Sequence, residues 1–363
     1  MMKKRNILIG AIVLVLGVTA LILVKVNARH ATFKQDYHIA DTHTVTRIFM
    51  ADKENNQVLL SRNPGGTGDS AWLVDEQFYA SGAKVDLLLE TLGEMRIRQQ
   101  VNKAAAASVV KALSAHSIKV EVYQNRYFIN WFKGKFRLFP HEKLTATYYI
   151  GHETQDMMGT NAFREGDKFP VIIHIPGFRG FLSPRFITNP LLWRSHRVVD
   201  LPVQKIAEVE VQIPAKPQES FAIVREGDGF RFQLLQTKQY VEGFDTARVA
   251  QMLSSFVNLN FDEYAKAVPQ AELDSTFSKA PRTILKVTDV NGKSRELKTY
   301  IKYTNPQDAV TMPDTNMYNV FDLNRLYAVL DNKDTVLIQY YVFDNILQPA
   351  SFFLGRGGAP VAK

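Results

Sequence analysis

The stretch SGAKVDLLLETLGEM (residues 81–95) places its apolar residues at the spacing of one buried helix face. The same spacing returns in DTARVAQMLSSFVNL (residues 245–259). Each stretch begins with a residue suited to cap a helix, Ser81 in the first and Asp245 in the second. Strands are predicted before each helix, and a second helix and further strands after it. The sequence therefore predicts two copies of one strand–helix–helix–strand unit.

The predicted fold class is α+β with mainly antiparallel sheets. Apolar and polar residues alternate along strands such as AEVEVQI (residues 207–213), which is typical of a sheet with one solvated face. The first copy is predicted over residues 41–199 and the second over 200–347, with a flexible tail over 348–363. A chance likeness between two amphipathic helices is the alternative to duplication.

An insertion distinguishes the two copies. Residues 126–143, RYFINWFKGKFRLFPHEK, have no counterpart in the second copy, and Lys133 with Gly134 suits the turn of a protruding hairpin. Aromatic and basic side chains together suit an acidic protein, a glycan or a membrane interface. A hairpin with one packed and one solvated face is the alternative. The candidate partner-binding residues here are Trp131, Phe132, Lys133, Lys135 and Arg137.

The N-terminal region contains an uncharged stretch, ILIGAIVLVLGVTALILV (residues 7–24). It is nearly long enough as a helix to cross the hydrocarbon core of a bilayer. Basic residues before it favour a cytoplasmic N-terminus. Residues 1–30 are therefore predicted to hold a single-pass, signal-anchor transmembrane helix of the inner membrane, with residues 31–40 as a tether and the rest extracytoplasmic. A cleaved signal peptide and a buried core helix are the alternatives.

The composition of the chain excludes several kinds of chemistry. The 363 residues contain no cysteine, which excludes disulfides, thiolate chemistry and cysteine-ligated metals. Hydrophobic residues make up 46% of the chain, enough for a substantial core. The net charge of +8 is concentrated at the N-terminus and in residues 96–143, so the basic character is local. No cofactor, metal or nucleic-acid partner is expected.

Few residues suit catalysis, and a group of arginines suits binding. Asp156 with His174, or Glu153, could act as acid and base, but a structural histidine is the simpler interpretation. The histidines are scattered without the spacing of metal ligands. Guanidinium groups near the turn PGFRGF (residues 176–181) suit carboxylate or phosphate partners, unless they serve to bridge the two copies. These candidate arginines are Arg179, Arg185 and Arg194.

One region carries a family resemblance. Its segments read YYIGHETQDMMGTNAF (148–163), VIIHIPGFRGFLSPRF (171–186) and WRSHR (193–197), with IFMADK (48–53) upstream. Together they resemble the bacterial domain-of-unknown-function family 4340, most closely its Bacteroidota-type members, over most of residues 40–347. The resemblance implies one N-terminal membrane segment, an exported α/β part and neighbours among envelope transport and gliding-type components. That family has no established activity, and the hairpin looks longer here than its pattern.

These features predict a non-catalytic interaction or scaffold module of the bacterial envelope, an accessory subunit of a transport or secretion complex. The expected partners are the lipid bilayer through residues 7–24 and an envelope protein or acidic surface. The alternatives are an exported hydrolase acting on glycan or peptide, and a ligand-binding auxiliary of a transporter that uses a groove between the copies. A deep polar pocket with a converged acid–base pair would favour the hydrolase.

Overall fold

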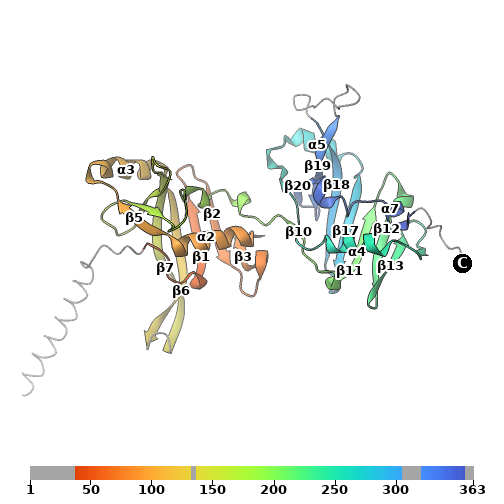
Figure 1. The fold of residues 1–363 in the computed structure, drawn as a ribbon, viewed down its shortest axis with the longest axis horizontal. Helices are drawn as coiled ribbons and strands as arrows, with labels where there is room; N and C mark the ends of the chain where they lie inside the picture. Colours follow the sequence, from red (N-terminus) through yellow and green to blue (C-terminus); the bar gives the residue numbers. More distant parts are fainter. Residues whose placement is uncertain (1–36, 132–135, 305–319, 356–363) are drawn as a thin grey trace, which may run out of the picture. The chain divides into compact units, whose positions relative to one another are not determined.

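The structure, a computed structural model, describes residues 37–131, 136–304 and 320–355 (Figure 1). The chain divides into two compact units, Met1–Arg194 and Ser195–Lys363. Each unit has its own sheet and its own hydrophobic core. The division falls a few residues before the boundary predicted at 199/200.

The first unit is built on a nine-stranded sheet whose neighbouring strands are all antiparallel. From edge to edge the strands are β4 (Phe78–Tyr79), β3 (Trp72–Val74), β2 (Gln57–Arg62), β1 (Val45–Ala51), β6 (Ile118–Trp131), β7 (Phe136–Glu153), β8 (Thr160–Arg164), β9 (Val171–His174) and β5 (Arg96–Gln100).

Among the described residues, two α-helices accompany this sheet, α2 (Gly82–Glu94) and α3 (Lys103–His116). Helix α2 lies across the sheet in Figure 1 and buries the apolar face that its spacing predicts. Ser81 occupies the position before the helix, but its side chain makes no capping bond. The Asp69 carboxylate instead accepts a hydrogen bond from the Gly82 amide at 2.9 Å, so a residue distant in sequence satisfies the helix start.

The second unit repeats this strand order position by position. From edge to edge its nine strands are β14 (Tyr240–Val241), β13 (Gly229–Leu234), β12 (Phe221–Glu226), β11 (Ile206–Gln212), β17 (Thr283–Asp289), β18 (Ser294–Tyr303), β19 (Phe321–Leu330), β20 (Asp334–Gln339) and β16 (Glu263–Tyr264). A separate two-stranded sheet pairs β10 (Arg197–Val199) with β15 (Leu259–Asn260). In both units the strand at the far edge, β5 or β16, comes from the chain between two helices.

The helices of the second unit are α4 (Thr246–Ser254), α5 (Gln270–Phe277), α6 (Tyr340–Phe343) and α7 (Ala350–Leu354). Asp245 caps α4 by accepting hydrogen bonds from two backbone amides. Short 3₁₀ helices occur in both units at η1 (Thr42–Thr44), η2 (Gly68–Ala71), η4 (Ser183–Arg185), η5 (Pro190–Leu192), η6 (Val203–Lys205), η7 (Pro217–Glu219) and η8 (Ala265–Ala267).

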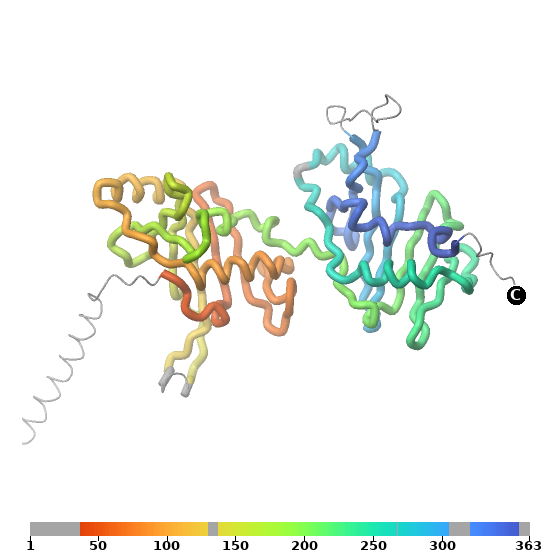
Figure 2. The backbone as a smooth tube through the Cα atoms, in the orientation of Figure 1, coloured from red at the N-terminus to blue at the C-terminus, as the bar shows by residue number. Residues whose placement is uncertain are grey.

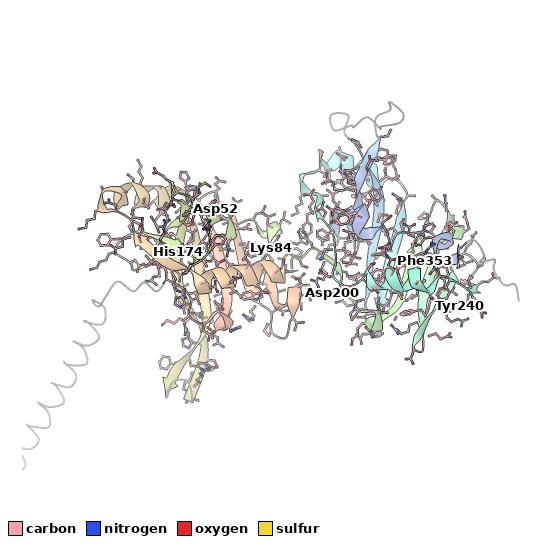
Figure 3. All side chains as sticks on the ribbon, in the orientation of Figure 1. Asp52, Lys84, His174, Asp200, Tyr240 and Phe353 are labelled. Carbon is pink, nitrogen blue, oxygen red and sulfur yellow. The ribbon has the colours of Figure 1, made fainter. Side chains whose placement is uncertain are left out.

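The start of the predicted flexible tail, residues 348–363, is part of the second core. Phe353 of α7, labelled in Figure 3, is fully buried, and its carbonyl accepts from the Asp245 amide at 2.7 Å. The prediction is wrong for residues 350–354, because the Gly/Pro-rich composition that motivated it begins after two phenylalanines that pack inward. Residues 356–363 lie outside the described residues.

The predicted α+β class is also wrong. The described residues are mainly antiparallel strand with few helices, arranged in two nine-stranded sheets and one two-stranded sheet. Each unit therefore contains more strand than the predicted strand–helix–helix–strand unit. In each nine-stranded sheet, four strands follow the second helix. Helical periodicity stands out over a dozen residues, whereas a strand of two to six residues leaves little pattern. A prediction based on periodicity therefore overstates the helical part of this chain.

The predicted transmembrane helix over residues 7–24 lies outside the described residues. Within the part of the chain that the structure describes, no helix is long and apolar enough to cross a membrane. The longest α-helix described, α3 with 14 residues, spans about 21 Å, whereas a bilayer core is about 30 Å thick. The prediction of a single-pass, signal-anchored transmembrane protein is therefore corrected: the structure supplies no such helix in its described residues.

Candidate functional site

The longest hairpin of the first unit extends past its own sheet. Strands β6 and β7 pair from Ile118↔Ile150 to Trp131↔Phe136. On one side β1 accompanies β6 only as far as Gln124. On the other side β8 pairs with β7 only from Tyr148 onward. Residues 125–131 and 136–142 thus form a two-stranded ribbon, hereafter the ribbon, which projects from the unit in yellow in Figure 2.

The second unit shows that this length is an addition. Its equivalent hairpin, β17 with β18, pairs only from Thr283↔Thr299 to Thr288↔Ser294. The Asp289 side chain closes the turn by accepting from the amides of Asn291 and Lys293 at 2.8 and 2.9 Å. The shared strand order therefore needs no ribbon to form a stable sheet. The insertion predicted at 126–143 coincides with the ribbon and the residue at its base.

The ribbon exposes large aromatic rings beside basic groups. Phe128 is 80% exposed and Phe139 is 66% exposed, values unusual for phenylalanine in a folded protein. The Arg137 guanidinium lies 5.5 Å from the centre of the Tyr127 ring, within the range of a cation–π contact. The Phe128 ring meets the His141 ring edge-on at 6.4 Å. Arg137, a predicted binding residue, is exposed.

The other predicted residues of the hairpin are only partly described. Trp131 ends β6, and nothing is described of its side chain. Phe132, Lys133 and Lys135, with the turn predicted at Lys133 and Gly134, lie outside the described residues. The described candidate residues of the ribbon are therefore Arg126, Phe128, Arg137 and Phe139.

Phe139 adopts a backbone conformation that phenylalanine rarely tolerates. Its φ is +59°, in the left-handed region that favours glycine. Pro140 follows it, and a proline restricts the preceding residue to extended conformations. Such a conformation costs about 1–2 kcal/mol. Because the ring is exposed, core packing does not repay this cost, and strain of this kind concentrates at functional sites.

Acidic residues at the base of the ribbon are engaged within the unit. Glu142 forms an ion pair with Arg47 at 2.7 Å and accepts from the Thr46 hydroxyl at 2.6 Å. The Tyr123 hydroxyl donates to Glu121 at 2.8 Å, and this hydrogen bond, followed by burial, raises the pKa of Tyr123. Contacts within the unit thus neutralise the acidic residues where the ribbon joins the sheet, and the charge on the projecting part of the ribbon is positive.

The three predicted arginines occupy different environments. Arg179 is exposed. Arg185 is half-buried, donates to the Thr91 hydroxyl at 2.9 Å and lies 4.7 Å from the centre of the Phe178 ring. Arg194 is only 6% exposed, and its guanidinium lies 3.6 Å from the centre of the Phe78 ring. The structure therefore leaves Arg179 accessible to a partner and gives Arg194 a role in packing.

The proposed acid–base residues are held by structural contacts. Asp156 accepts hydrogen bonds from the Thr154 hydroxyl, the Met158 amide and Arg98, and these bonds lower its pKa to about 2. A carboxylate with so low a pKa is a poor general base near neutral pH. His174, labelled in Figure 3, has its pKa lowered by burial and by the nearby Arg98 charge. Asp156 thus pairs with a cation that sequence reasoning did not assign to it.

Two further findings concern identity and cofactors. Among the described residues, no three histidine, cysteine or acidic side chains converge as a metal site would require. Comparison of the chain with known protein families, with curated proteins and with solved structures gave no match. The resemblance to the domain-of-unknown-function family 4340 therefore stays a prediction.

Proposed function

We propose that the first unit is a non-catalytic interaction module and that the ribbon binds an acidic protein partner. The observation that supports the proposal most is Phe139. It holds an exposed aromatic ring on a strained backbone, midway along the ribbon, and the equivalent hairpin of the second unit has no such ribbon. A strained, exposed aromatic residue does not stabilise the isolated unit, so we infer that it serves to bind a partner.

The composition of the ribbon suits this role. Exposed aromatic rings supply large contact areas at low conformational cost and dominate the binding energy of many protein interfaces. The guanidinium groups of Arg126 and Arg137 would speed encounter with a negatively charged surface and select against basic ones. The outer edges of both strands also lack a paired neighbour beyond Gln124 and Tyr148 among the described residues, which suits strand addition by a partner.

The competing hydrolase reading receives less support from the described residues. Asp156 closes a turn and pairs with Arg98, and the pKa values of Asp156 and His174 are both lowered. A hydrolase would be favoured instead by a carboxyl whose pKa is raised towards neutrality beside a second titratable group.

Site-specific crosslinking in the source cell tests the proposal. A photoreactive residue at Phe128 should capture a protein partner, whereas one at Val110, an exposed apolar residue of α3, should not. The double variant Phe128→Ser, Arg137→Glu should lose at least tenfold in affinity for the captured partner, because an aromatic anchor and a favourable charge are both removed.

The chain offers a matched control for this double variant. Val110→Ser with Lys111→Glu likewise replaces an apolar residue with serine and a cation with glutamate on the exposed surface of α3, and it should leave affinity within about twofold. The loss of affinity in the ribbon variant should become smaller as the salt concentration is raised, since exposed charges are screened within about 10 Å at 0.1 M salt. Equal loss in both double variants, or capture from Val110 alone, would argue against binding at the ribbon.

A further inference from the structure

A pocket of about 500 Å³ opens in the second unit, at the end of the sheet where β17 and β18 meet the chain that follows α5. Its volume lies within the range of small-molecule sites. Residues from β18, from the segment between α5 and β17, from the chain after β11 and from the segment before α7 contribute to its wall. The pocket therefore belongs to one unit and does not involve the ribbon.

The charged groups of this pocket are all positive. Lys216, Lys279 and Arg282 line it, and no aspartate or glutamate of the described residues does. The Lys279 ammonium lies 4.2 Å from the centre of the Tyr303 ring, and Arg282 donates to the Tyr340 hydroxyl at 2.8 Å. Within the described part of the chain, no ion pair engages these three cations. Their charge is thus available to an anion.

The rest of the wall is apolar and partly uncovered. Ile301 is 40% exposed and Tyr303 is 44% exposed, although both stand on β18 beside the buried Tyr300. Leu347, from the chain that follows α6, also lines the pocket. Exposed isoleucine and tyrosine in a concave site gain free energy when an apolar ligand removes them from water.

We propose that this pocket binds a monocarboxylate with an apolar body, of the size of a medium-chain fatty acid. The cations would hold the carboxylate through charge-assisted hydrogen bonds, with the Arg282 fork suited to both of its oxygens. The apolar wall of β18 would cover the hydrocarbon part. A small inorganic anion would leave that wall exposed, and an uncharged lipid would leave the cations unpaired, so neither matches the whole site.

Calorimetric titration of the full-length chain with octanoate tests this ligand class. Octanoate is expected to bind one site per chain, with acetate and octan-1-ol each at least tenfold weaker. Acetate keeps the charge without the apolar body, and octan-1-ol keeps the apolar body without the charge. Tight binding of acetate, or of octan-1-ol at the affinity of octanoate, would overturn the assignment of the ligand.

Variants locate the binding. Lys279→Glu should weaken octanoate binding about tenfold or more, because it replaces a hydrogen-bonding cation with a repelling charge. Lys293→Glu is the matched control, since Lys293 is also exposed but follows the far end of β17, about 20 Å along the strand from Arg282. Lys293→Glu should change the affinity by less than twofold.

Each result decides the proposal. Lys279→Gln removes the positive charge without adding a negative one, and it is used in place of Lys279→Glu if circular dichroism shows that Lys279→Glu is misfolded. Binding that is unaffected by either Lys279 variant would place the ligand elsewhere, for example on the apolar N-terminal stretch, and would overturn the proposal. So would the absence of heat with octanoate at millimolar concentration. Because the pocket and the ribbon lie in different units, either proposal can fail alone.

Discussion

The guanidinium of Arg98 donates a hydrogen bond of 2.9 Å to the carboxylate of Asp156, which lies in the turn that joins β7 to β8. Arg98 also donates to the Met158 carbonyl at 3.1 Å. The two residues therefore fasten the β7–β8 turn to β5, the edge strand that reaches this sheet from between α2 and α3. A carboxylate that resembled a catalytic base in the sequence serves here as a structural acceptor.

This contact predicts an acid-sensitive contribution to stability. Asp156 has a pKa of about 2 in the folded chain, against about 3.9 in an unfolded one. Because the folded pKa is the lower one, the carboxylate stabilises the fold above about pH 4, and its contribution declines as the pH falls towards 2. Asp156→Asn should lower the urea midpoint of the first unit at pH 7, and the difference should shrink below pH 4.

The control for this prediction is Asp86→Asn, which removes an exposed carboxylate from α2. It should have little effect on the midpoint at pH 7. An NMR titration of the Asp156 carboxyl provides a direct check. A midpoint near pH 4 in that titration would show that the hydrogen bonds around Asp156 do not favour the charged form.

The buried face of α2 gives a second prediction. Leu88 is almost fully buried, whereas its neighbour Leu87 is 43% exposed. Leu88→Ala should lower the free energy of unfolding of the first unit by about 2–5 kcal/mol, the range for buried leucines. Leu87→Ala should change it by less than about 0.5 kcal/mol. Urea unfolding followed by circular dichroism measures both, and similar losses would contradict the assigned face.

The elements that could be predicted from sequence are those with a strong local pattern. Helices α2 and α4 form where their apolar spacing predicts, and Asp245 caps α4 as its chemistry suggests. The far-edge strands β5 and β16 could not be predicted in this way. Each pairs with a strand much later in the chain, and β16 has only two residues. Pairing of that kind depends on the folded sheet and leaves no periodicity to detect.

In the candidate site, too, only the features with a local sequence pattern could be predicted. The ribbon could be located because an insertion and its composition are visible in the sequence. The burial of each arginine could not be predicted, because Arg179 and Arg194 share residue type and region but differ in burial. The strain at Phe139 left one weak signal, an aromatic residue directly before Pro140. The pocket at Lys279 gave none, since segments far apart in the chain line it.

The arginines provide a third prediction. Arg194→Ala should lower the free energy of unfolding of the first unit by about 1–3 kcal/mol, because it removes a buried side chain and its contact with the Phe78 ring. Arg179→Ala, on an exposed side chain, should cost less than about 0.5 kcal/mol. Thermal unfolding distinguishes the two. A neutral Arg194→Ala would mean that the packing against Phe78 is dispensable.

The strained residue of the ribbon gives the last prediction. In Phe139→Gly, relief of the left-handed backbone is worth about 1–2 kcal/mol, while the freedom of glycine in the unfolded chain costs about 0.5–1 kcal/mol. The variant should therefore unfold at an equal or slightly higher urea concentration than the parent. Phe128→Gly removes an even more exposed ring from a residue without a positive φ, so this variant should be slightly destabilised. If the ribbon binds through its aromatic rings, both variants should lose affinity for the partner captured at the ribbon, although their stabilities move in opposite directions. Loss of stability in both would show that the Phe139 backbone is not strained, and would remove the observation that most supports a binding role.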